Sequence, residues 1–84
     1  MSWIVYILEC ADKTLYTGIT NNLEHRLHAH ENGKGAKYTR GRGPFSVLYT
    51  ETLPTRSHAL YREAQIKRFD PEAKRNLVSA NTLP

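Results

Sequence analysis

Two apolar segments separated by a few polar residues begin the chain. Residues 3–8 are aromatic, aliphatic or β-branched throughout, which is typical of a strand buried on both faces. Residues 11–14 have turn chemistry, and residues 15–19 again carry strand formers. The pattern therefore predicts two antiparallel strands that form a hairpin.

A helix and a basic loop are predicted after the hairpin. Residues 20–22 offer capping side chains for a helix that begins near Leu23, and Asn32 with Gly33 supplies its stop. Residues 33–44 hold four glycines, one proline and four cations, a composition typical of a loop.

The second half of the chain predicts one more strand and two more helices. Residues 45–51 alternate as a third strand that Pro54 closes, and a second helix runs from about residue 57 to 69. On this helix, the residues available for packing against the rest of the protein are Leu60, Ala64 and Ile66. Asp70 before proline predicts a third helix to about residue 78. The order β-β-α-β-α-α predicts an α/β fold of the α+β type, with a three-stranded antiparallel sheet flanked by helices in one domain over residues 1–84.

Composition narrows the class of protein only slightly. Eighty-four residues suit a single compact domain. The lone Cys10 excludes an internal disulfide framework, and we expect it to be a small buried hydrophobe. Neither a membrane span nor a signal peptide is predicted, so the expected location is the cytoplasm. The net charge of +4 is only weakly indicative of a polyanionic partner.

Two tyrosines on the predicted hairpin are the first candidates for chemistry. An odd-numbered loop, such as residues 12–14, would put Tyr6 and Tyr16 on one face of the sheet, whereas a two-residue turn would separate them. Tyrosine is also a common strand residue whose ring packs while its hydroxyl stays in water. The pair alone therefore favours a structural role.

Three charged or titratable residues on the predicted helices strengthen the case for a site. Arg26 and His30 lie four residues apart, so they share one side of the first helix, while His25 and His28 face solvent. Glu63 falls in the apolar stripe of the second helix, where a carboxylate needs a cation nearby. That cation is either a metal ion or a side chain such as Arg26, and a structural ion pair is the alternative.

These residues together resemble the GIY-YIG nuclease superfamily. Ile4-Val5-Tyr6, ten residues before Tyr16-Thr17-Gly18, is similar to the paired signature of that family, and the remaining positions follow in order: Arg26, His30, Glu63 and Asn76. The similarity spans about residues 3–77. Small stand-alone members of the family are the most similar. The family also includes the nuclease domains of the excision-repair endonuclease UvrC and of some homing endonucleases, so DNA repair or recombination is the expected role.

The resemblance implies metal-dependent hydrolysis of phosphodiester bonds. Glu63 would hold Mg²⁺ or Mn²⁺, and Arg26 would stabilise the charge on the scissile phosphate. Tyr6 is favoured as the general base, with a pKa lowered from about 10, and Tyr16 as relay or phosphate contact, although the roles can be exchanged. His30 would assist proton transfer, and Asn76 and Gly18 would support the site.

Three positions depart from the family pattern. Ile4 stands where the signature has glycine and Thr17 where it has isoleucine, but neither position supplies a reacting group. Some members have a lysine directly after the second glycine, where this chain has Ile19. Lys34 or Lys37 is a candidate substitute for that lysine.

The basic loop is the candidate nucleic-acid contact. Its cations would follow phosphates while its tyrosine stacks on an unpaired base; the residues concerned are Lys34, Lys37, Tyr38, Arg40 and Arg42. The expected partner is DNA, single-stranded or branched rather than plain duplex, with RNA as an alternative. We expect little sequence specificity and a monomer or weak homodimer. The competing hypothesis is a nucleic-acid-binding module that does not cleave.

Overall fold

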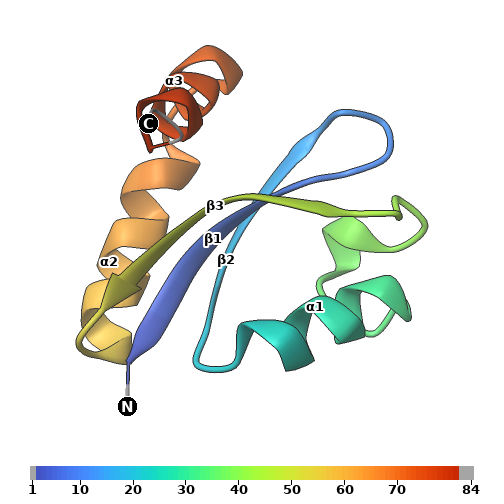
Figure 1. The fold of residues 1–84 in the computed structure, drawn as a ribbon, viewed down its shortest axis with the longest axis horizontal. Helices are drawn as coiled ribbons and strands as arrows, with labels where there is room; N and C mark the ends of the chain where they lie inside the picture. Colours follow the sequence, from blue (N-terminus) through green and yellow to red (C-terminus); the bar gives the residue numbers. More distant parts are fainter. Residues whose placement is uncertain (1, 82–84) are drawn as a thin grey trace.

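The fold is an α+β arrangement in which helices cover both faces of a small sheet (Figure 1). A computed structural model describes residues 2–81. Its elements follow in the order β1 Trp3–Glu9, β2 Leu15–Thr20, α1 Leu23–Glu31, the 3₁₀ helix η1 Lys37–Thr39, β3 Ser46–Leu53, α2 Arg56–Lys67 and α3 Pro71–Asn81. The predicted order β-β-α-β-α-α is confirmed. The basic loop differs from expectation, because it contains η1.

All three strands are antiparallel, and β1 lies between β2 and β3. The β1–β2 hairpin closes around residues 11–13, with hydrogen bonds from the Cys10 amide to the Thr14 carbonyl and from the Lys13 amide to the Cys10 carbonyl. Lys13 has a left-handed φ of 70°, which suits the last position of a three-residue loop. The loop is therefore odd-numbered, and residues of equal parity on β1 and β2 share a face.

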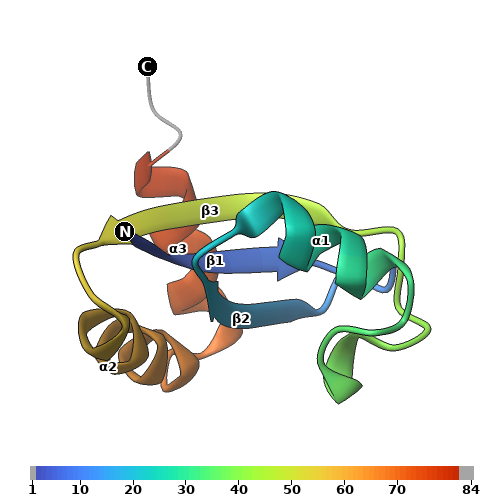
Figure 2. The same cartoon turned by 90° about the horizontal axis from the view of Figure 1, so that it is seen from below.

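The odd-numbered face of the sheet builds the main core. Val5 and Ile7 of β1 pack with Tyr49 of β3 and with Ala59 and Ile66 of α2. Figure 1 places α2 and α3 on this side and α1 with η1 on the other. Figure 2, seen from below, shows β2 as the edge strand, with α2 beside it. Cys10 is buried, as expected.

Of the three residues of helix α2 predicted to pack, Ile66 is confirmed and the other two are wrong. Leu60 and Ala64 are exposed, whereas Ala59 and Ile66 are fully buried. Residues 59, 63 and 66 follow helical spacing, so Glu63 does lie in the buried stripe. Beside this stripe, α2 also makes a polar contact with the sheet, because Arg62 donates a hydrogen bond to Glu51 of β3 at 3.1 Å.

The helix starts are capped as the sequence predicts. The side chain of Asn22 accepts the amide of His25 at the start of α1, and Asp70 accepts the amide of Ala73 at 2.8 Å at the start of α3. None of the helices between residues 2 and 81 combines the length and apolar character that crossing a membrane requires.

Candidate active site

Tyr6 and Tyr16 project from the same face of the sheet toward α1. Tyr6 pairs with Gly18 across the hairpin, and Tyr16 lies two residues before Gly18 on β2. The two tyrosine rings are 6.3 Å apart between centroids. The predicted odd register is what brings these two signature tyrosines together.

Gly18 leaves the space in which the Tyr6 ring lies. A Cβ atom at position 18 would stand 2.6 Å from the Tyr6 hydroxyl oxygen and 3.0 Å from the ring of Tyr16. No side chain can therefore be added without moving the tyrosines. The role of Gly18 is to let the Tyr6 ring cross directly over β2.

Gly18→Ala is expected to lower the free energy of unfolding by about 1–3 kcal/mol, as overpacking in a rigid core does. The added methyl group displaces the Tyr6 hydroxyl from its partner, so any activity that depends on Tyr6 should fall as well. Urea unfolding and a cleavage assay measure the two effects.

Gly33→Ala is the matched control for that substitution. Gly33 has φ of +72° and nothing within 4 Å, so alanine there adds backbone strain but leaves the tyrosines in place. If Gly18→Ala is no less stable than wild type, the space that Gly18 leaves for the Tyr6 ring does not contribute to the free energy of unfolding.

His30 is the buried partner of Tyr6. Its Nε2 lies 2.9 Å from the Tyr6 hydroxyl oxygen and its Nδ1 lies 2.8 Å from Oγ1 of Thr39. The Thr39 hydroxyl donates to the carbonyl of Ala36 at 2.9 Å, so it accepts from Nδ1–H of the histidine. This network assigns the neutral Nδ1–H tautomer to His30, with the Tyr6 hydroxyl donating to Nε2.

The surroundings of His30 keep its ring neutral. The ring is 1% exposed, and the backbone of Gly35 lies against it, leaving no room for a Cβ atom there. Burial, and then repulsion by Arg26, lower the pKa of His30 below its ordinary value. A neutral histidine in this tautomer can accept a proton from Tyr6.

Arg26 lies beside the hydroxyl groups of both signature tyrosines. Hydrogen bonding to Tyr6 raises the pKa of Arg26, opposed by burial, and Tyr16 adds smaller contributions in the same direction. The guanidinium therefore places a permanent positive charge beside the two tyrosines.

The resemblance implies a lowered pKa for the catalytic tyrosine, whereas the protein groups around Tyr6 shift its pKa in the opposite direction. Burial raises the pKa of Tyr6 above its ordinary value, and hydrogen bonding to Arg26 opposes this rise without cancelling it. The reason is that the residue is only 1% exposed, so the tyrosinate is poorly solvated. Tyr6 is a neutral hydroxyl group that donates to His30.

Glu63 reaches the site from α2. Its side chain is 17% exposed, and its carboxylate forms an ion pair with Lys67, one turn further along the helix, at 3.4 Å. Its negative charge also raises the pKa of Tyr6, although less than burial and Tyr16 do, which places the carboxylate within electrostatic reach of the tyrosines. The cation predicted near Glu63 is therefore Lys67 in this structure.

The donor set fits a magnesium ion held in part by substrate. Between residues 2 and 81 there is no cluster of three or more His, Cys, Asp or Glu side chains that could hold a metal alone. Mg²⁺ is commonly bound by one or two carboxylates together with water and substrate phosphates. A single carboxylate such as Glu63 would meet that requirement together with water and a substrate phosphate.

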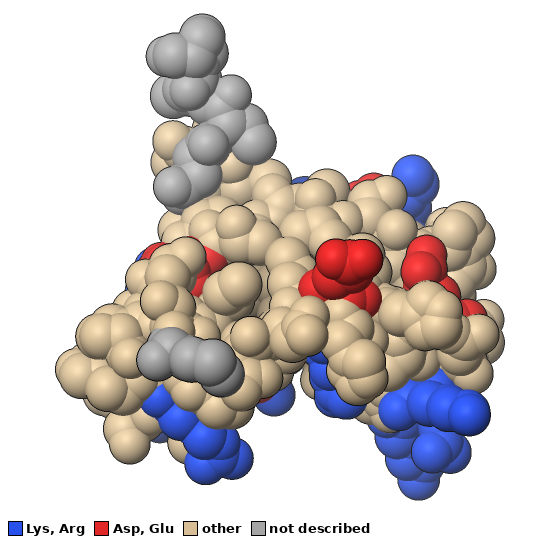
Figure 3. Space-filling view, turned by 60° about the horizontal axis from the view of Figure 1, so that its bottom comes forward, with Lys and Arg blue, Asp and Glu red and all other residues tan. Residues whose placement is uncertain are grey.

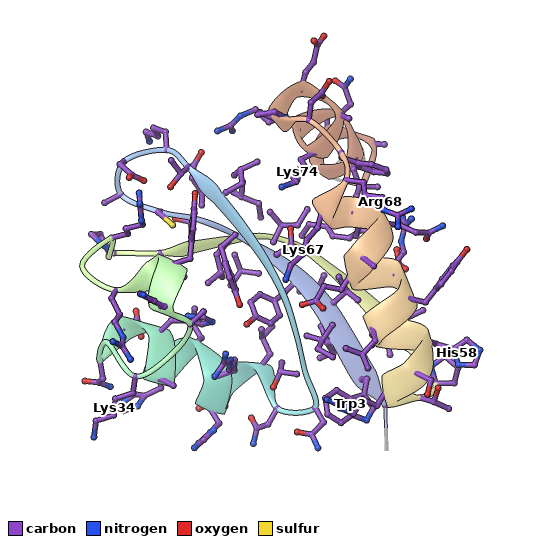
Figure 4. All side chains as sticks on the ribbon, turned by 180° about the vertical axis from the view of Figure 1, so that it is seen from behind. Trp3, Lys34, His58, Lys67, Arg68 and Lys74 are labelled. Atoms are coloured by element: carbon purple, nitrogen blue, oxygen red, sulfur yellow. The ribbon has the colours of Figure 1, made fainter. Side chains whose placement is uncertain are left out.

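The basic loop divides into residues near the site and residues away from it. Tyr38 stacks on Tyr16 with centroids 5.9 Å apart, and the guanidinium of Arg42 lies 4.7 Å above the Tyr38 ring. Arg42 also forms an ion pair with Asp12 of the hairpin turn. Lys34, in contrast, projects away from the sheet (Figure 4). Lys37 and Arg40 are exposed.

Sequence analysis missed one buried residue of the site and named another that has no contact with the site in the described part of the chain. Thr39 is 1% exposed and orients His30, but a threonine in a basic loop carries no signal of such a role. Asn76 is exposed on α3, and its side chain makes no hydrogen bond within the described part of the chain. The supporting role expected of Asn76 stays a prediction that no contact here supports.

The class of protein follows from this arrangement and from comparison with known families. The model of the GIY-YIG catalytic domain matches residues 2–76. The chain belongs to the GIY-YIG family, a family of nucleases.

Its relatives are small proteins of similar length. The chain is 58% identical over 74 residues to the UPF0213 protein OB0043 of Oceanobacillus iheyensis, covering 88% of this chain and 86% of that protein. It is 51% identical over 79 residues to the UPF0213 protein CPE1444 of Clostridium perfringens, covering 94% of this chain and 85% of that protein. The solution NMR structure of the UPF0213 protein BH0048 from Bacillus halodurans is 44% identical and superposes with a TM-score of 0.64, covering 100% of this chain and 89% of that one.

Proposed function

We propose that this chain is a metal-dependent endonuclease that hydrolyses phosphodiester bonds in DNA, with preference for single-stranded or branched substrates and little sequence specificity. The observation that carries the proposal is the line of hydrogen bonds from Tyr6 through His30 to Thr39, with Arg26 beside Tyr6. A binding module needs phosphate contacts but no buried line of proton donors and acceptors that ends at the site.

The proton of the attacking water passes to the Tyr6–His30 pair. The Tyr6 oxygen takes a proton from the water while its own proton moves to Nε2 of His30, and the resulting imidazolium still donates Nδ1–H to Thr39. The hydroxide forms a bond to phosphorus as the bond to the leaving oxygen breaks. Tyr6 fills this role better than Tyr16, since it is hydrogen bonded to the neutral histidine.

Charge on the phosphate is offset by Arg26, whose planar guanidinium can donate two parallel hydrogen bonds. Glu63 would hold the divalent cation, which when bound supplies positive charge that stabilises the phosphate and the leaving oxygen. Half-buried Tyr16 contacts the phosphate between these groups.

A cleavage assay with Arg26→Ala as its matched control tests the proposal. Purified protein is incubated with single-stranded, duplex and branched DNA, with Mg²⁺, with Mn²⁺ or with EDTA. We expect metal-dependent cleavage that falls by about 10²–10³-fold in Arg26→Ala, as for the removal of one preorganised charge stabiliser. If neither metal supports cleavage, or if the variant prepared in the same way cuts equally well, the proposal fails.

One observation favours the second candidate function, a nucleic-acid-binding module that does not cleave. Glu63 is already ion-paired with Lys67, so a cation competes with an internal partner for this carboxylate. Binding of DNA by both wild type and Arg26→Ala, without cleavage by either, would support this alternative.

A further inference from the structure

Two adjoining hollows run along the free edge of β2, next to the site. The first has a volume of about 390 Å³ and is lined by Leu15, Tyr16, Thr17, Tyr38, Lys67 and Lys74. The second, of about 340 Å³, extends toward the hairpin turn, the first turn of α3 and Arg75. Both are lined by Leu15, Tyr38 and Lys74, so they form one groove, called the β2 groove below. It begins at the signature tyrosine Tyr16.

Cations from α2 and α3 point into the β2 groove. Figure 4 shows Lys67 and Lys74 directed toward β2, whereas the neighbouring Arg68 points away from the sheet. Lys74 is half-buried and has no carboxylate partner among residues 2–81. A partly desolvated ammonium group without a counter-charge favours binding of an anion. Figure 3 shows Lys and Arg gathered along the lower margin of the molecule, in large groups at its two ends and in smaller patches between them.

Aromatic surface lies opposite these lysines. Tyr38 is 44% exposed, lines both hollows and stacks on Tyr16. Aromatic rings beside lysines are the combination that binds unpaired nucleotides, because an unpaired base offers its face while its phosphates contact the cations. In a duplex the faces of the bases are already stacked on one another, so this combination favours a single strand.

We propose that the β2 groove binds the single-stranded segment that flanks the scissile phosphate. In this assignment Lys67 and Lys74 contact neighbouring phosphates and Tyr38 contacts a base. The position of the scissile phosphate in this assignment rests on the proposed nuclease function. Of the residues assigned to strand binding, Tyr38 belongs to the predicted basic loop, whereas Lys67 and Lys74 lie outside it.

Binding of a fluorescein-labelled oligothymidylate, followed by fluorescence anisotropy in EDTA, tests the β2 groove without cleavage. Lys74→Gln is expected to weaken binding about three- to tenfold at low salt and to reduce the slope of log affinity against log salt by about 0.7, the value for one lost phosphate contact on a single strand. Arg68→Gln removes the same charge from the outer face and should leave the slope close to that of wild type. Thermal unfolding confirms that both variants are folded.

Tyr38→Leu provides an independent readout. It keeps apolar bulk but removes the ring, so affinity for the single strand should fall about fivefold or more while duplex affinity changes little. Strand binding by the β2 groove is refuted if wild type does not bind oligothymidylate or if Lys74→Gln and Arg68→Gln behave alike. It is also refuted if Tyr38→Leu lowers the affinities for single strand and duplex equally. Failure of the nuclease proposal alone would give a different result: cleavage would be absent, while binding that depends on Lys74 would persist.

Discussion

Replacing Glu63 with glutamine is expected to reduce metal-supported cleavage by about a thousandfold or more, while the protein stays folded and still binds DNA. Glutamine keeps the size of the side chain but removes the negative charge that would hold a divalent cation, a contribution of several kcal/mol in metal-assisted hydrolysis. The fold should tolerate the change, since the ion pair lost, to Lys67, joins neighbouring turns of a helix and is worth only about 0.3–0.5 kcal/mol.

Initial cleavage rates measured over a range of Mg²⁺ and Mn²⁺ concentrations check this result. Glu72→Gln is the matched control, because Glu72 is an exposed acid in the first turn of α3 and plays no part in the site. A Glu63→Gln protein that cleaves as fast as Glu72→Gln, with the same dependence on metal concentration, would show that Glu63 holds no metal.

Tyr6→Phe is expected to slow single-turnover cleavage by about 10²–10⁴-fold, the usual contribution of a general acid or base. The ring still packs against Gly18, but the water then has no oxygen to accept its proton, and Nε2 of His30 is left without a partner. That buried unpaired nitrogen should also lower the free energy of unfolding by about 1–3 kcal/mol.

Tyr61→Phe serves as the control, because Tyr61 is 70% exposed on α2. Tyr16→Phe distinguishes the roles of the two signature tyrosines. If Tyr16→Phe is as slow as we expect of Tyr6→Phe, and Tyr6→Phe cleaves nearly as fast as wild type, then the roles are exchanged.

The pH dependence of the wild-type rate identifies the proton acceptor within the same experiment. The pKa of His30 is lowered and that of Tyr6 is raised. A neutral His30 accepts the proton at all pH values above its lowered pKa, so the rate should be level from about pH 7 to 9. A tyrosinate base would instead give a rate that climbs tenfold per pH unit toward pH 10.

The same shifts define two limits of stability. Below about pH 6.5 the unfolded chain takes up a proton at His30 more readily than the folded chain does, so stability falls as the pH falls. Above about pH 10 the unfolded chain loses the Tyr6 proton first, so stability falls again as the pH rises.

Local patterns along the chain were sufficient to predict the architecture and most of the residues of the site. Period-2 and helical spacing, capping residues and the Asp70-Pro71 start predicted the element order, because each of these signals acts within a few residues along the chain. The position of Glu63 in the stripe of Ala59 and Ile66 followed from helical geometry in the same way. The signature tyrosines required one further condition, an odd hairpin loop, and the structure meets it with residues 11–13.

The sequence by itself thus determined the family, the fold and the order of the site residues along the chain. Only the tertiary structure decided their electrostatics and their partners. Burial raises the pKa of Tyr6 because desolvation depends on what α1 and η1 place over it. Thr39 orients His30 across nine residues, and Lys74 meets the edge of β2 from the far end of the chain. Such contacts depend on how whole helices pack, and no local period along the chain encodes them.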